Sequence, residues 1–235
     1  MPIDPDPAET PLSKLPNFDP RTVPVLGIDS HLPPVAPAAL APAALRERFL
    51  APPSWQPEIW IERKFSSRPL SKAAVLVPLV MRERPTVLLT ERTTHLSTHS
   101  GQVAFPGGRQ DESDTDAAHT ALREANEEIG LQPGLVEVIG QMPTYTTGSQ
   151  FIITPVVALV SPDHRLTLNT FEVADAFEVP LEFLMNPAHH RRHAFEWGGA
   201  RREWFSMPYM DGTSERFIWG ATAAMLRNFY RLLSA

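Results

Sequence analysis

The sequence predicts an α/β (α+β) fold, an α/β/α sandwich with a mixed β-sheet. Apolar segments typical of strands lie on both sides of one helix pattern at 115–129, and a second helix pattern lies at 221–233. The chain has 235 residues, of which 43% are hydrophobic, so it can fill the core that such layers enclose.

The prolines divide the chain into two parts. Fourteen of the 25 prolines lie in residues 1–57. Because proline has no N–H donor and a fixed φ, this part is not expected to form regular sheet or a long helix. We expect extended chain at 1–36 and a short helix at Pro42–Leu50, with proline in its first turn. The sequence therefore predicts a proline-rich arm at 1–68, acting as a surface wrap or linker, and one folded domain at 69–235.

The first strands of the domain come before the central helix. Residues 73–81 are almost all apolar and predict a buried strand, although Pro78 makes it an edge or bulged strand. Short apolar segments predict two more strands at 87–90 and 103–105, and the second of these ends at Pro106-Gly107-Gly108.

The central helix is expected at 115–129, with Asp114 or Thr115 as its N-cap and Gly130 as the left-handed residue that ends it. The later elements are expected to be strands at 135–141, 151–160 and 165–168, a short helix at 179–185, a hairpin with strands at 193–197 and 203–207, and a C-terminal helix at 221–233. Strands on both sides of a helix favour a mixed sheet with helices on its faces.

The central helix carries one acidic stripe. Glu124, Glu127 and Glu128 stand at i, i+3 and i+4, so their carboxylates lie on one face. Such carboxylates repel one another, and a divalent cation with oxygen ligands, such as Mg²⁺, would compensate them. A solvated acidic face is the alternative. Arg123 and the Gly107-Gly108 turn favour the metal site, because an arginine can hold one carboxylate and glycines let backbone carbonyls approach.

The net charge of −6 is concentrated in one segment. Residues 111–128 hold seven acidic residues and one base, so the remainder of the chain is formally neutral. An acidic chain lacks the basic face of a duplex DNA binder, so we expect no nucleic-acid partner. The absence of cysteine excludes disulfides, thiolate zinc sites and a cysteine nucleophile. With no apolar run of about 20 residues, no membrane partner is expected and the protein should be cytoplasmic. The sequence leaves the oligomeric state open, with a homodimer as one possibility.

Residues 123–131 (REANEEIGL) resemble the second half of the Nudix box, R-E-U-x-E-E-x-G-U, at every fixed position. The first half, G-x5-E before x7-R-E, matches less well, because Thr115 stands at its Glu position and Arg109 at its Gly position. The chain is thus similar to the Nudix hydrolases. The resemblance implies a Nudix-like sandwich and a Nudix hydrolase domain at 69–235.

The neighbouring segments resemble the coenzyme A pyrophosphatase subfamily in particular. In that subfamily FPGG is followed by an aspartate-rich turn and TALREAxEE, and this chain has FPGG at 105–108 and TALREANEE at 120–128. Upstream, LLTER at 88–92 and GQVAFPGG at 101–108 fit the subfamily signature LLTxR[SA]x3Rx3Gx3FPGG. Two positions of that signature depart, since the chain has threonine for Ser or Ala at 93 and Ser97 for Arg.

The resemblance implies metal-dependent hydrolysis of the diphosphate of coenzyme A or its acyl derivatives, with Mg²⁺ or Mn²⁺ as the cofactor. The products would be 3′,5′-ADP and (acyl-)4′-phosphopantetheine. If the arginine missing at Ser97 contacts substrate phosphate, the substrate is instead another nucleoside diphosphate derivative, such as ADP-ribose, a dinucleotide or an oxidised nucleotide. A catalytically silent ligand-binding module is a third alternative, and the intact set of repelling carboxylates counts against it.

The resemblance also assigns roles to residues. The implied metal ligands are Glu124, Glu127, Glu128 and the carbonyl of Gly108. The implied catalytic residues are Glu127 as a base or ligand, Glu124, Arg123 as the residue that orients a carboxylate, and Glu172 as an acidic residue from a distant loop, with Asp175 and Glu178 behind it. The candidate substrate contacts are Arg92, which could instead pair with an aspartate, Gly107, Gly108, and Tyr145 as a ring that stacks on adenine.

Overall fold

The computed structural model describes residues 12, 18–58, 69–94, 101–197 and 199–235. Its larger sheet has the order β4-β3-β2-β8-β6, with β5 paired to β2, β7 to β8 and β9 to β3. The strands of this mixed sheet are β2 (Ser71–Val80), β3 (Thr86–Arg92), β4 (Val103–Ala104), β5 (Gly107–Arg109), β6 (Val136–Gln141), β7 (Tyr145–Thr146), β8 (Phe151–Val160) and β9 (Val173–Pro180). β2 and β8 run parallel over ten residue pairs and the other pairings are antiparallel, which confirms the predicted mixed sheet.

A second, antiparallel sheet has the order β1-β10-β11-β12. Its strands are β1 (Val25–Ile28), β10 (Arg191–Trp197), β11 (Ala200–Asp211) and β12 (Ser214–Trp219). The helices are α1 (Pro42–Leu50), α2 (Ala117–Ile129), α3 (Leu181–Leu184) and α4 (Gly220–Leu233), with short 3-10 turns at Pro37–Leu40, Pro133–Leu135 and Pro187–His189. None of the helices in the described ranges is both long and apolar enough to cross a membrane.

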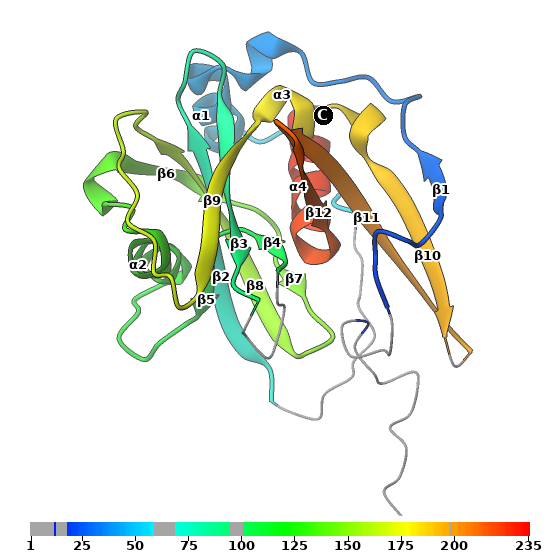
Figure 1. Cartoon of the computed structure of the whole chain (residues 1–235). Coiled ribbons are helices and arrows are strands. Elements are labelled where there is room, and N and C mark those ends of the chain that lie inside the picture. Colours follow the sequence, from blue (N-terminus) through cyan, green and yellow to red (C-terminus); the bar gives the residue numbers. More distant parts are fainter. Residues whose placement is uncertain (1–11, 13–17, 59–68, 95–100, 198) are drawn as a thin grey trace, which may run out of the picture.

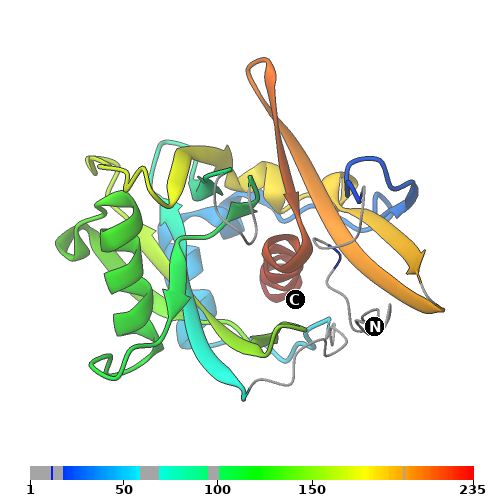
Figure 2. The same ribbon diagram turned by 60° about the horizontal axis from the view of Figure 1, so that its bottom comes forward.

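Two hydrophobic clusters hold the layers together. On one face of the mixed sheet, α2 packs through Ala121, Ala125 and Ile129. On the other face, side chains from α1 and α4 pack against the sheet, and Figure 2 shows α4 lying between the two sheets. Because strands alternate their side chains, Leu88 belongs to the α2 side and Leu89 to the α4 side. The predicted sandwich is therefore confirmed, with a further sheet outside α4 (Figure 1).

Several elements have the predicted bounds, and others do not. α1 and β8 match residue for residue, and α4 begins one residue earlier than expected. The strand expected at 165–168 is wrong, because these residues form no regular element. β9 and β12 were not predicted. β9 includes charged residues that pair with arginines distant in sequence, so its alternation is partly hidden in the sequence.

Pro78 does not put β2 at an edge, which corrects the sequence prediction. β2 lies between β3 and β8 in the middle of the mixed sheet. On one side, β2 pairs with β5 up to Val75 and with β3 only from Leu79. Pro78 falls in the gap between these two ladders, where a missing N–H breaks no regular pairing with either strand.

The N-terminal part of the chain contributes to both sheet and core. The expectation that it forms no sheet is wrong at β1, a short edge strand that pairs with β10. Val35, Leu40 and Leu45 are buried in the core cluster on the α4 side. The proposed boundary between arm and domain falls at the end of residues 59–68, which lie outside the described ranges.

Candidate active site

α2 is a well-capped helix whose ends fix the position of its acidic stripe. The carboxylate of Asp116 accepts a hydrogen bond from the His119 N–H at 2.8 Å, so the N-cap is Asp116 and not the predicted Asp114 or Thr115. Gly130 ends the helix in the left-handed conformation, with φ 68°, as predicted. The helix turns Ala121 and Ala125 toward the sheet, so the stripe lies along the side of α2 that borders β5.

The two glycines of β5 allow close packing in two different directions. A Cβ added to Gly107 would lie 2.4 Å from the carbonyl oxygen of Ala74, on β2. A Cβ added to Gly108 would lie 2.6 Å from each atom of the Glu124 carboxylate. Gly107 therefore lets β5 lie against β2, and Gly108 leaves room for a carboxylate beside its backbone.

Glu128 is the most buried carboxylate of the stripe, with only 5% of its side chain exposed. Its Oε2 accepts a hydrogen bond from the Gly107 N–H at 3.1 Å, and its Oε1 lies 3.7 Å from an Arg92 nitrogen. Burial raises the pKa of Glu128 to about 7, against the opposing effects of these two partners. Burial also raises the pKa of Glu124. For both carboxylates, the loss of solvent thus outweighs the effect of the neighbouring arginine, Arg123 at Glu124 and Arg92 at Glu128.

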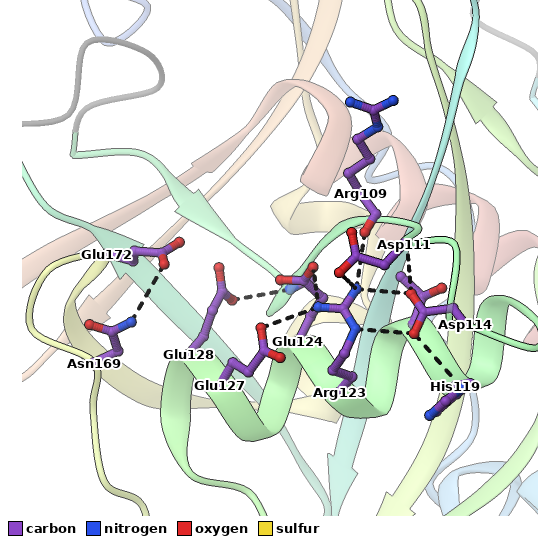
Figure 3. Close-up of polar contacts among 12 residues, drawn as sticks. Arg109, Asp111, Asp114, His119, Arg123, Glu124, Glu127, Glu128, Asn169 and Glu172 are labelled. Atoms are coloured by element: carbon purple, nitrogen blue, oxygen red, sulfur yellow. Dashed lines mark hydrogen bonds and ion pairs between the residues drawn. The ribbon is translucent and has the colours of Figure 1, made fainter.

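Arg123 is hydrogen-bonded to most of the stripe (Figure 3). It donates to Glu124 at 2.9 Å and to Glu127 at 3.2 Å. It also donates two hydrogen bonds to Asp114, from Nε at 3.1 Å and from Nη2 at 2.9 Å. These bonds hold the pKa of Asp114 well below its usual range. The carboxyl group of Asp114 is fully buried, and the sequence signal for it was weak: an aspartate one residue before the position where the Nudix box expects Glu.

Glu172 is brought to the same place by the turn before β9, which lies on the α2 side of the sheet. The N–H of Asn169 donates to the carbonyl of Glu128 at 2.8 Å, which ties this turn to the last residues of α2. The Asn169 side chain donates to Glu172 at 3.4 Å, and Figure 3 shows Glu172 beside Glu128. The charge of Glu172 is among the causes that raise the pKa values of Glu124 and Glu128.

The alternatives to Glu172 have other partners. Asp175 pairs with Arg216, and Glu178 pairs with Arg82 at 2.7 Å. Neither is brought to the acidic stripe by any contact in the described ranges. Glu172 is therefore the distant carboxylate that the fold adds to α2.

Arg92 stands at the end of β3, next to Glu128, and pairs with no aspartate of the described ranges. Its Nε is buried and has no hydrogen-bond partner among the described residues. A buried donor without a partner costs about 1–3 kcal/mol, so the surroundings of Arg92 are incomplete without a further acceptor. Tyr145 is mostly buried in the core cluster of the α4 side, and its stacking role stays a prediction. Ser97 lies outside the described residues.

The oxygen atoms of this site suit a hard divalent cation. Glu124, Glu127, Glu128 and Glu172 supply four carboxylates, and burial disfavours the charged forms of two of them. In the described part of the chain no three acidic or histidine side chains converge to hold a metal as they stand. Arg123 and the Gly107 N–H hold these oxygens instead. The donor set fits a hard cation, which would share Glu124 and Glu127 with Arg123.

Comparisons with known proteins identify the family of the chain. The NUDIX domain family model matches residues 70–198. The uncharacterized Nudix hydrolase NudL of Escherichia coli (strain IAI39) is 41% identical over 157 residues, which cover 66% of this chain and 79% of NudL. NudL of Enterobacter sp. (strain 638) is 42% identical over the same shares of the two chains. The crystal structure of a C. elegans Ap4A hydrolase binary complex aligns with a TM-score of 0.41 and 19% identity, over 51% of this chain and 86% of that one.

The family match includes β3, the glycine turn and the whole of α2, which are the elements that build the acidic site. Proteins of this family generally act with divalent metal ions, and the carboxylates on α2 are ligands suited to such ions. The chain therefore belongs to the Nudix family, and it is a hydrolase that acts on pyrophosphate bonds.

Proposed function

We propose that the protein hydrolyses the diphosphate bond of coenzyme A or its acyl derivatives, releasing 3′,5′-ADP and (acyl-)4′-phosphopantetheine. The support for this substrate is the pair of segments at 88–92 and 101–108, which fit the signature of the coenzyme A pyrophosphatase subfamily. In the fold the first segment ends at Arg92 and the second at Gly108, and both ends contact glutamates of α2. The closeness of these two segments to the acidic stripe supports a substrate site there.

The observation that carries the metal-dependent part of the proposal is the buried Glu128, with the partly buried Glu124, beside the ends of these two segments. Ionised carboxylates that are buried close together repel one another and lose hydration, and a bound cation offsets this cost in free energy. We propose Mg²⁺ or Mn²⁺ as that cation, held by Glu124, Glu127, Glu128 and the carbonyl of Gly108. When bound, it lowers the pKa of a water molecule and neutralises charge on the diphosphate.

Each remaining residue has a role that follows from its contacts. Arg123, fixed by Asp114, orients Glu124 and Glu127. Arg92 offers its guanidinium, including the unpartnered Nε, to a phosphate oxygen. Glu127 has the most exposed carboxylate of the stripe, at 57%, so water reaches it. Glu127 and Glu172 are the two candidates to accept the proton of the attacking water.

The direct test is incubation of the purified protein with coenzyme A and Mg²⁺ or Mn²⁺, with the products separated by chromatography. We expect 3′,5′-ADP and 4′-phosphopantetheine, and no product when the metal is chelated. Absence of product above the metal-free control would rule out coenzyme A as the substrate. Glu128→Gln is the matched inactive variant, and it should fold, because it preserves the shape of the side chain.

A panel of diphosphates tests the alternative that Ser97 raises. The values of kcat/KM for coenzyme A, acetyl-coenzyme A, ADP-ribose, a dinucleotide and an oxidised nucleotide rank the substrates directly. A higher kcat/KM for ADP-ribose than for coenzyme A would move the assignment to that substrate class. Calorimetric Mg²⁺ binding that Glu128→Gln abolishes, with no hydrolysis of any compound, would identify a silent binding module. We further propose a cytoplasmic location. Analytical ultracentrifugation of the purified protein would decide whether it is a monomer or a homodimer.

A further inference from the structure

Arg216, on β12, joins the second sheet to the mixed sheet. Its guanidinium donates to Glu91 at 2.9 Å, to Asp211 at 3.1 and 3.2 Å, and to Asp175. It also lies 4.2 Å from the centre of the Phe177 ring. One arginine, with only 14% of its side chain exposed, therefore meets carboxylates from β3, β9 and β11.

Two of these carboxylates stand directly opposite each other. Glu91 on β3 pairs with Asp175 on β9 in the antiparallel ladder. Like charges in opposite positions of neighbouring strands repel and weaken the pairing. Because Arg216 donates to both carboxylates, it offsets this repulsion and holds the two strand ends together.

The ladder is irregular immediately beside this pair. Glu91 opposes Asp175, but the next residue, Arg92, opposes Val173, so Ala174 is an extra residue on β9. Residues two apart on a regular strand share a face. Here Val173 packs in the α2 cluster, whereas Asp175 meets Arg216 on the other face of the sheet. The extra residue therefore reverses which face the side chains of β9 point to.

The bulge lies next to the active site on both strands, because Arg92 ends β3 and Glu172 directly precedes β9. Arg92 reaches Glu128 at 3.7 Å. The N–H of Thr93 donates to the carbonyl of Glu172 at 3.0 Å, and its hydroxyl donates to the carbonyl of Phe171, also at 3.0 Å. The positions of Arg92 and Glu172 over α2 thus depend on how these two strand ends are held.

We propose that Arg216 is a positioning residue for the diphosphatase reaction: it holds Glu91 against Asp175 and so keeps Arg92 and Glu172 in place over the carboxylates of α2. The proposal rests on the proposed function. The family model matches residues 70–198, and Arg216 lies beyond them. The β11–β12 hairpin would thus contribute to an active site whose other residues all lie in the matched range. Figure 2 shows this hairpin projecting from the second sheet.

The test compares the parent with three variants. Arg216→Gln leaves Glu91 and Asp175 facing each other without a cation. The triple variant Glu91→Gln/Asp175→Asn/Arg216→Gln removes the repulsion as well. Arg201→Gln is the control, because the ion pairs of this arginine among the described residues are with Glu196 and Glu203 at the surface of the second sheet. Circular dichroism first establishes that each variant is folded.

We expect kcat/KM for coenzyme A to fall about 10- to 100-fold in Arg216→Gln, because small displacements of positioned groups have effects of this size. The triple variant should recover most of this loss, and Arg201→Gln should match the parent. Mg²⁺ affinity measured by calorimetry should be unchanged throughout, since the glutamates of α2 are intact. Recovery in the triple variant would show that Arg216 acts by offsetting the repulsion between Glu91 and Asp175, and unchanged Mg²⁺ affinity would separate this effect from general disruption of the site.

Hydrogen exchange at the Thr93 amide gives a second readout that needs no activity. Loss of Arg216 should speed this exchange about tenfold, and the triple variant should slow it again. If the parent hydrolyses no diphosphate, the proposed function fails and the exchange result still decides the role of Arg216. An active parent with Arg216→Gln at the same kcat/KM, or unchanged exchange at Thr93, would overturn the proposal.

Discussion

Gly108→Ala tests the geometry of the acidic site more sharply than removal of a glutamate. The added methyl group would lie 2.6 Å from the Glu124 carboxylate, whereas ordinary contacts begin near 3.4 Å. The carboxylate must therefore move by about 0.8 Å, and a displacement of this size in a catalytic group can cost about 100-fold in rate. The Gly108 carbonyl itself is retained. We expect a folded protein with kcat for coenzyme A lowered about 100-fold.

Two other glycines provide matched controls for this variant. Gly107→Ala would place a methyl group 2.4 Å from the backbone of β2, so it should destabilise the fold and lower Tm. Gly134→Ala meets no atom within 4 Å and should behave like the parent. Kinetics, Tm and calorimetric Mg²⁺ affinity are measured for all three. A folded Gly108→Ala protein with parental kcat and Mg²⁺ affinity would refute the close approach of Glu124 to this backbone.

The remaining predictions concern charge. Burial raises the pKa of Glu128 to about 7 in the folded protein, against 4.5 in the unfolded chain. In metal-free protein, the contribution of the neutral Glu128 side chain to folding stability is therefore fully present below pH 4.5 and is lost as the pH rises through 7. Denaturant titrations of metal-free protein should therefore show stability falling between about pH 4.5 and 7, and Glu128→Gln should flatten that slope. Mg²⁺ affinity should rise over the same pH range, because the cation binds the deprotonated carboxylate; affinity independent of pH would contradict this. Asp114→Ala leaves Arg123 without its buried partner and should cost about 3 kcal/mol of unfolding free energy and lower kcat, whereas the exposed Asp163→Ala should change neither.

Sequence reasoning succeeded where structure follows from local spacing. The three glutamates share a side of α2 because positions i, i+3 and i+4 do so in any helix, and Gly130 ends α2 because glycine adopts the left-handed conformation easily. It failed at β9 and at the N-cap. Asp175 and Glu178 on β9 are paired with Arg216 and Arg82, and neither arginine is near in sequence.

The sequence by itself thus determined the family, the acidic stripe and the glycine turn, because each is written in short segments whose spacing sets their geometry. Only the tertiary structure decided which residues surround them. Asp114 at Arg123, Arg92 at Glu128 and Glu172 beside α2 are contacts that depend on the packing of the sheet against the helix. The burial that raises the pKa of Glu128 likewise arises only from that packing, so the raised pKa could not be predicted from the sequence pattern.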